Sequence, residues 1–268
     1  MTQATTSHAF FTKLALRDVL GLGLLVGGFV WLLARGAAQL GYHWQWYRVP
    51  ALFFSLDQGH PLPGPLLKGL GVTLAIAGAA MFLALGFGLA AALLRLSRSL
   101  FGRAAARVYL ETIRNTPLLV QIFFLYFVLG PALCLNRFWA AVLALSLFEG
   151  AYASEIFRSG ILSIERGQWE AAYSLGLSTA QTYRRVILPQ ALRRVLPPLA
   201  GLAVSLVKDS ALASTIAIAD LAWHGQVIVS QTFLAFEVWF TVAALYLVLT
   251  LGLSFLGAQL ERRFKRET

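Results

Sequence analysis

Charged residues and cysteines are scarce in this sequence. Asp, Glu, Lys and Arg make up 13% of its 268 residues, against about 25% in a soluble globular domain. Apolar residues reach 58%, which excludes both a soluble domain and a disordered chain. The single cysteine, Cys134, excludes an internal disulfide and a paired-cysteine metal or redox site. No Gly-x-x-x-x-Gly-Lys-Ser/Thr run exists, so the chain has no P-loop of its own.

Motifs of metal sites and of enzymes are also missing. The four histidines, His8, His43, His60 and His224, do not have the His-Glu-x-x-His spacing of a zinc site. No Gly-x-Ser-x-Gly turn or Ser-Lys pair indicates a nucleophile. We therefore predict no metal, no cofactor bound by this chain and no enzymatic activity.

What the sequence does have is six long apolar runs. They lie at roughly 19–40, 66–94, 117–135, 138–157, 195–219 and 235–257. A helix of about 20 residues crosses the roughly 30 Å of hydrocarbon, and in lipid the backbone must satisfy its own hydrogen bonds. The sequence thus predicts an all-α integral membrane protein with six transmembrane helices. Lys13 and Arg17 precede the first run as in a signal peptide, but no small-residue cleavage site follows, so we predict an uncleaved helix.

Positive charge gathers on one side of these spans. Seventeen of the 22 Lys and Arg residues lie in four segments: 1–18, 95–116, 158–194 and 258–268. The opposite side has three, Arg48, Lys68 and Arg137. By the positive-inside rule both termini are cytoplasmic. This distribution also explains the net charge of +10, so we expect no nucleic-acid partner.

The cytoplasmic segment 158–194 is too long for a plain connector. Its sequence predicts a short helix at 168–175, with Gly176 in the left-handed conformation that ends a helix. Ser178 and Gln181 have the spacing of a capping box, which starts a second helix. We predict a helix–turn–helix whose turn projects from the cytoplasmic surface. The alternative is an amphipathic element at the interface without a partner.

Prolines indicate further helix boundaries: Pro117, Pro189 and the pair Pro197-Pro198. In the triplet that begins with Asn115, Thr116 is expected to cap the third span and Pro117 to take its first turn. The later prolines are expected to punctuate the entry to the fifth span.

The loop resembles the EAA loop of ABC-importer permeases. Glu170-Ala171-Ala172 is followed after three residues by Gly176 and, further on, by Leu188-Pro189. Two other segments, 111–121 and 208–212, resemble the polar amino-acid branch of these permeases. The resemblance covers 66–268, the five-helix permease core. Residues 1–65 are then an N-terminal cytoplasmic segment, an extra transmembrane helix and an outer loop.

The resemblance implies a set of partners. In that family the EAA loop seats in a cleft of a cytoplasmic ABC ATPase dimer, which binds ATP and Mg²⁺. Glu170 would be a polar contact or cap, and Gly176 would allow the tight turn. A second permease subunit, the same chain or a similar one, completes the pathway, and an extracytoplasmic binding protein delivers a polar amino acid. The expected location is the bacterial inner membrane.

Three charged residues lie deep in the predicted spans: Glu149, Lys208 and Asp209. Such residues are costly in lipid and by default mark a functional site. Because an amino acid carries an ammonium and a carboxylate, a pocket with both signs suits it; alternatively these charges pair across helices. Nearby hydroxyl groups would add donors: Ser205, Ser210, Ser214 and Thr215. Glu155 is expected to pair with Arg158, three residues on.

Two other functions are alternatives to the importer. An ion-coupled secondary amino-acid transporter would use Glu149, Lys208 or Asp209 as coupling groups, but the two halves of the chain show no inverted repeat. It would also leave the long EAA-type loop without a purpose. A membrane enzyme lacks the motifs named above.

Overall fold

The structure is a computed structural model that describes residues 19–32, 34–36, 41–57 and 60–265. Lys13, Arg17 and the end of the first predicted span, 37–40, lie outside the described residues. The chain divides into two units, residues 1–46 and 47–268. In the first unit, the helix Val19–Gly36 has 18 residues and is apolar enough to cross a membrane.

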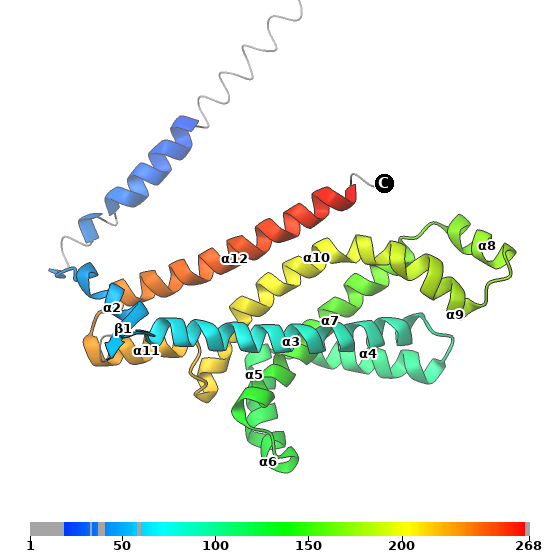
Figure 1. Ribbon diagram of the computed structural model, residues 1–268, viewed down its shortest axis with the longest axis horizontal. Coiled ribbons are helices and arrows are strands. Elements are labelled where there is room, and N and C mark those ends of the chain that lie inside the picture. The colour runs from blue at the N-terminus through cyan, green and yellow to red at the C-terminus, as the bar shows by residue number, and fades with distance from the viewer. Residues whose placement is uncertain (1–18, 33, 37–40, 58–59, 266–268) are drawn as a thin grey trace, which may run out of the picture. The chain divides into compact units, whose positions relative to one another are not determined.

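Helices make up most of the second unit (Figure 1). In chain order, the elements from residue 46 onward are η1 (Trp46–Arg48), α2 (Pro50–Phe53), β1 (Phe54–Asp57), β2 (His60–Pro63), α3 (Pro65–Leu96), α4 (Leu100–Arg114), α5 (Leu118–Phe123), η2 (Phe124–Leu129), α6 (Gly130–Leu133), α7 (Arg137–Leu162), α8 (Arg166–Ser174), α9 (Thr179–Thr182), η3 (Tyr183–Ile187), α10 (Leu188–Asp209), η4 (Ser210–Ile216), α11 (Leu221–Thr232) and α12 (Ala235–Lys265). The strands β1 and β2 form an antiparallel hairpin, with Phe54 opposite Pro63.

The fold class predicted from the sequence is confirmed. Within the described residues, five helices are long and apolar enough to cross a membrane, or six if the bent pair α4 and α5–α6 counts as one span. Three long helices of the second unit coincide with predicted spans: α3, α7 and α12. The fourth stretch, Thr179–Ile216, contains most of the predicted span 195–219 but begins well before it. The predicted span at 117–135 corresponds to α5, η2 and α6.

The segment 95–116 is more than the charged connection that the sequence suggested, because α4 fills most of it. Small and apolar residues at a spacing of four form its buried face: Gly102, Ala106 and Leu110. The Tyr109 hydroxyl donates to the Leu147 carbonyl at 2.6 Å and so attaches α4 to α7. The rest of the helix surface is mixed: Arg103 and Arg107 are exposed, and so are the apolar side chains of Phe101 and Val108.

The chain turns sharply at Pro117, where α4 and the α5–α6 helix meet at 106°. The prediction that Thr116 caps the following helix is wrong. Its hydroxyl donates backward to a carbonyl of α4 at 2.7 Å, and the Asn115 amide likewise donates to the Glu111 carbonyl at 2.8 Å. Gln121 closes the corner instead, donating to two carbonyls at 2.8 and 2.9 Å. The helix does begin directly after Pro117, but a side chain from its own second turn holds its start.

The proline pair Pro197-Pro198 also departs from expectation, because α10 runs through it without a break. Only Pro189 lies in the first turn of that helix, directly after the π-helical segment η3. Inside a membrane bundle, neighbouring helices and local adjustments can satisfy the carbonyls that a proline frees, so a proline need not end the helix.

Helices α3 and α7 pack along one another through small residues. A β-carbon built on Gly88 would lie 2.6 Å from the Ala153 methyl carbon and 3.0 Å from the Gly150 carbonyl oxygen. On the other side, a β-carbon on Gly150 would lie 3.0 Å from the Phe87 side chain. Because lipid tails are as apolar as the side chains, such close packing is a main source of helix association in a membrane.

Gly88→Ala is expected to destabilise the protein by about 1–3 kcal/mol, the usual cost of overpacking a tight contact. The matched control is Gly86→Ala on the same helix, where an added β-carbon meets nothing within 4 Å. This control should be neutral or slightly stabilising. Thermal unfolding of the full chain in detergent measures both. Equal unfolding temperatures for the two variants would contradict the close packing of α3 and α7.

Candidate functional site

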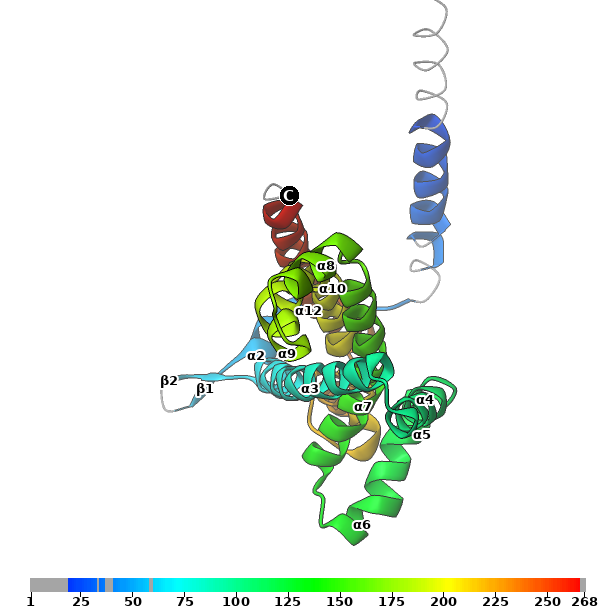
Figure 2. The ribbon, with the colours of Figure 1, turned by 90° about the vertical axis from the view of Figure 1, so that its right-hand side faces the viewer.

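The helix–turn–helix predicted in the cytoplasmic loop is present as α8, a turn, and α9. It lies at one end of the second unit, opposite the end that contains α11 and the β hairpin (Figure 1). In the view along the bundle, α8 and α9 are the nearest elements (Figure 2).

Backbone hydrogen bonds explain the shape of this turn. Gly176 has φ +73°, the left-handed conformation that costs a residue with a β-carbon about 1–2 kcal/mol. The Gly176 N–H donates to the Tyr173 carbonyl at 2.9 Å, and the Leu177 N–H donates to the Ala172 carbonyl at 3.2 Å. This pair of bonds is the Schellman motif, which satisfies the last carbonyls of a helix.

A capping box starts the next helix, as predicted. The Gln181 N–H donates to the Ser178 hydroxyl at 3.3 Å, while the Gln181 side chain accepts from the Ser178 N–H at 2.9 Å. The turn between α8 and α9 is therefore held by its own local bonds on both sides.

Two contacts fasten α8 to the chain that follows it. The Trp169 and Tyr183 rings meet edge to face, with centroids 5.1 Å apart. The Gln190 amide donates to the Gln168 side chain at 3.1 Å. Ala172 is 2% exposed, so its small side chain faces inward. Any force on α8 thus passes directly to η3 and the start of α10.

The outer face of α8 is exposed and mixed in character. Glu170 is exposed and pairs with Arg166 at 3.0 Å, and Ala171 is exposed beside it. The sequence analysis missed two apolar side chains here: Tyr173 is 47% exposed and Leu175, next to the glycine turn, is 80% exposed. Their place directly before a helix-ending glycine was the available signal. Together these residues form an apolar tip with a charged flank, which suits insertion into a cleft of another protein.

The other two motif residues, Leu188 and Pro189, do not share this surface. They lie at the start of α10 and line an apolar cavity against α7. The motif therefore includes residues of both the projecting α8–α9 turn and the first turn of α10.

A second candidate site is a groove between α7 and α10. Its cavity has a volume of about 280 Å³, and Glu149 and Asp209 both line it. The two acidic side chains thus face one cavity. Its wall also includes Tyr152, Ser205 and Leu202. Because two carboxylates in one cavity repel each other, the pair favours a cationic group between them.

The remaining predicted pathway residues are placed differently. Lys208 is exposed and Ser210 is fully buried, and neither is among the residues that line the groove. The Ser210 hydroxyl donates to the Val207 carbonyl at 2.8 Å. The predicted donors Ser214 and Thr215 likewise donate to carbonyls of their own segment. The structure thus unites Glu149 with Asp209 and leaves these hydroxyl donors engaged by backbone.

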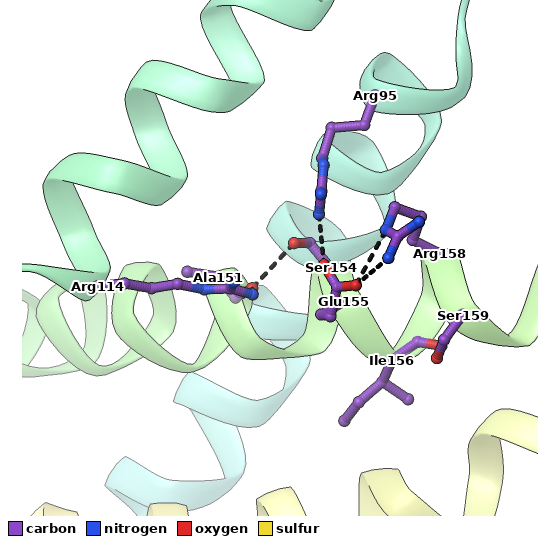
Figure 3. A network of polar contacts seen from close by, with 8 residues as sticks. All are labelled: Arg95, Arg114, Ala151, Ser154, Glu155, Ile156, Arg158 and Ser159. Atoms are coloured by element: carbon purple, nitrogen blue, oxygen red, sulfur yellow. Dashed lines mark hydrogen bonds and ion pairs between the residues drawn. The ribbon is translucent and has the colours of Figure 1, made fainter.

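An ion-pair network lies on another side of α7 (Figure 3). Glu155 and Arg158 pair as the sequence predicted. Arg95, from the last turn of α3, joins them with 2.6 Å between its Nη1 and Glu155 Oε2. Arg114, from the end of α4, donates to the Ala151 carbonyl. Arginines from two other helices are therefore anchored on one stretch of α7.

In the part of the chain that the structure describes, no group of three or more His, Cys, Asp or Glu side chains could hold a metal ion.

Comparison with known proteins agrees with this arrangement. Residues 83–266 match the family described as binding-protein-dependent transport system inner membrane component. The chain is 42% identical over 203 residues to the glutamine transport system permease protein of Escherichia coli, covering 75% of this chain and 93% of that protein. It is 44% identical over 178 residues to the L-cystine transport system permease protein of Bacillus subtilis, covering 65% and 76%.

A solved structure shows the same fold. It is described as the crystal structure of an amino acid ABC transporter with histidines, and it is 38% identical with a TM-score of 0.68. The match covers 74% of this chain and 94% of that one.

An apolar helical bundle whose matching family and relatives are transport permeases is the membrane-spanning subunit of a transporter. The chain belongs to the family of binding-protein-dependent transport system inner membrane components, and it is a permease subunit of an ABC importer. ATP hydrolysis belongs to a partner protein, and the chain is a multi-pass membrane protein.

Glu155→Gln is expected to lower the unfolding free energy by about 1 kcal/mol, because it removes a charge that two partly exposed arginines share. Glu170→Gln, which breaks only the well-exposed pair with Arg166, should change it by less than about 0.5 kcal/mol. Thermal unfolding at low and high salt measures both. The difference in unfolding free energy between the two variants should shrink in high salt. A larger loss of stability for Glu170→Gln than for Glu155→Gln would contradict the stabilising role of the Glu155 network.

Proposed function

We propose that this permease imports polar amino acids and is driven through the α8–α9 turn by a cytoplasmic ATPase dimer. The observation that carries the proposal is the exposed turn at Gly176, stiffened by bonds on both sides and fastened to α10. The substrate class rests on the relatives named above, whose names refer to glutamine and L-cystine.

The proposed orientation puts both termini and the α8–α9 turn in the cytoplasm. Its support is the excess of Lys and Arg on that side, which includes Arg166 and Arg184 in the loop itself. An extracytoplasmic amino-acid-binding protein would then approach the opposite end, near α11. In this proposal the lipid bilayer surrounds the apolar outer faces of the bundle, and no nucleic acid is a partner.

The groove between α7 and α10 is the proposed substrate pathway. A groove that opens on one side of a single chain is half of a channel, so a second permease subunit, the same chain or a similar one, would face it. Glu149 and Asp209 would receive the ammonium group of the substrate, because two neighbouring carboxylates attract a cation. Lys208, the residue before Asp209, is exposed and does not line the groove, so the proposal assigns it no contact with the substrate.

The alternative function is an ion-coupled amino-acid transporter, and the same carboxyl pair is the observation that favours it. Paired acids at membrane depth are common in proton and sodium pathways. The two functions differ in what drives uptake, ATP or an ion gradient.

Gly176→Val is expected to abolish coupling while leaving the bundle folded, because a β-branched residue resists the left-handed conformation. A strain of about 1–2 kcal/mol shifts the population of the native turn by about five- to thirty-fold. The matched control is Gly167→Val in the same loop. Gly167 does not have a positive φ, and a β-carbon added there meets nothing within 4 Å.

Both variants are measured in proteoliposomes with the partner ATPase and the binding protein. Wild type and Gly167→Val should show ATP-dependent uptake of labelled amino acid and substrate-stimulated ATP hydrolysis, and Gly176→Val should lose both. Uptake without ATP, driven by an ion gradient, would refute the importer and support the alternative.

Glu149→Gln and Asp209→Asn are each expected to lower uptake by about tenfold or more, because a charge-assisted hydrogen bond is worth about 1.5–3 kcal/mol. Ser210→Ala is the control, since this hydroxyl bonds its own backbone, and it should transport normally. Transport rates in the same proteoliposomes, at equal protein content, give the comparison. Impaired transport by Ser210→Ala with normal transport by Glu149→Gln would contradict the proposal that the groove is the substrate pathway.

A further inference from the structure

An apolar cavity lies between α3, α7 and the junction of η3 with α10. Its volume is about 410 Å³, within the range of pockets that hold small molecules. Its lining includes apolar side chains from three helices: Leu89, Phe157, Ile161, Leu192 and Val195. Leu188 and Pro189 of the motif also line it, but the α8–α9 turn and the proposed substrate groove lie outside it.

The cavity lies near the α8–α9 end of the bundle. Ile161 is one residue before the end of α7, and Phe157 is about one turn further in. Leu89 lies two turns before the end of α3. In the proposed orientation the cavity lies at the cytoplasmic boundary of the bilayer, with Leu89, Phe157 and Val195 on the side of the predicted spans and Arg184 in the cytoplasmic segment.

One charged side chain, Arg184, stands in the lining of this cavity. It is exposed, and no described residue pairs with its guanidinium group. Its neighbour Arg185 is also exposed but does not line the cavity. A fork of guanidinium donors above an apolar slot has the chemistry that a phosphate ester with hydrocarbon tails requires.

We propose that this cavity binds an anionic phospholipid, with one acyl chain in the apolar slot and the headgroup phosphate on Arg184. Basic pockets between transmembrane helices on the cytoplasmic side suit such lipids. The apolar lining supplies affinity for the chain, and Arg184 selects the headgroup.

The bound lipid has a mechanical consequence, which rests on the proposed coupling function. One wall of the cavity is the end of α7, which leads into the α8–α9 loop, and the other is η3 and α10, which lead out of it. A lipid between these two arms would fix their separation. Coupling to the ATPase should therefore depend on anionic lipid.

Binding is measured first, on the full chain without any partner. The purified protein is titrated with phosphatidylglycerol and with phosphatidylcholine of equal chain length, and bound lipid is counted by native mass spectrometry. Wild type should retain phosphatidylglycerol at least fivefold better than phosphatidylcholine. Glycerol phosphate, which has the headgroup charge but no acyl chains, should not compete. Equal retention of the two lipids, or displacement by glycerol phosphate, would overturn the proposal.

Two pairs of variants test the two ends of the ligand. Arg184→Gln should lose the preference for phosphatidylglycerol, whereas Arg185→Gln should keep it. Leu192→Trp fills the slot and should reduce binding at least fivefold. Its control, Leu162→Trp, changes an equally exposed leucine outside the cavity. Equal losses within either pair would show only general charge or surface effects and would refute the site.

Folding and competition by protein are checked separately. Arg184→Lys keeps the charge and should retain most of the binding, and unfolding temperatures show whether each variant is folded. Leu192→Cys, combined with Cys134→Ser, reports occupancy of the slot in the assembled transporter. Cross-linking of that cysteine to another subunit would mean that a protein helix fills the slot, which also overturns the proposal.

Transport in phosphatidylglycerol and phosphatidylcholine vesicles then tests the consequence. Wild type should transport faster with the anionic lipid, and Arg184→Gln should lose this difference. Because binding is measured without ATPase, failure of the coupling function would leave the lipid result intact. Lipid binding without any effect on transport would confine the inference to a binding site.

Discussion

Helices α3 and α7 approach so closely at Gly88 that a single added methyl group would overlap Ala153. In lipid, where burying apolar surface brings little gain, this fit of small residues is what holds one helix against the other. It sets the position of α7, and the other faces of that helix depend on it. Glu149 is next to Gly150, which takes part in this contact. The packing of α3 against α7 therefore determines where Glu149 lies in the groove.

Different faces of α7 make different contacts. One face meets α3, another presents Glu149 and Tyr152 to the groove, and a third binds Arg95 through Glu155. Toward its end, Gly160 gives room to Val195 of α10. A displacement of α10 relative to α7 would therefore alter the groove and the apolar cavity together.

The connection from the projecting turn to the groove is nearly continuous helix. Residues Thr179–Ile216 form a single helical stretch of 38 residues, with the capping box at one end and Asp209 near the other. The π-helical segment η3 and Pro189 widen and loosen the backbone just after the turn. The pair Pro197-Pro198 lies halfway along. At these places a force on α8 would bend the long helix before the movement reaches Asp209 and Glu149.

Sequence alone determined what depends on neighbours along the chain. The apolar runs, the left-handed Gly176, the capping box of Ser178 and the pair of Glu155 with Arg158 all follow from spacings of a few residues, so they were predicted correctly. Tertiary structure decided what depends on distant partners. Glu149 and Asp209 are sixty residues apart in the sequence, and no periodicity indicates which faces of two apolar helices will meet. The direction of the helix after Pro117 likewise depends on its packing against α7, which joins residues far apart in the sequence.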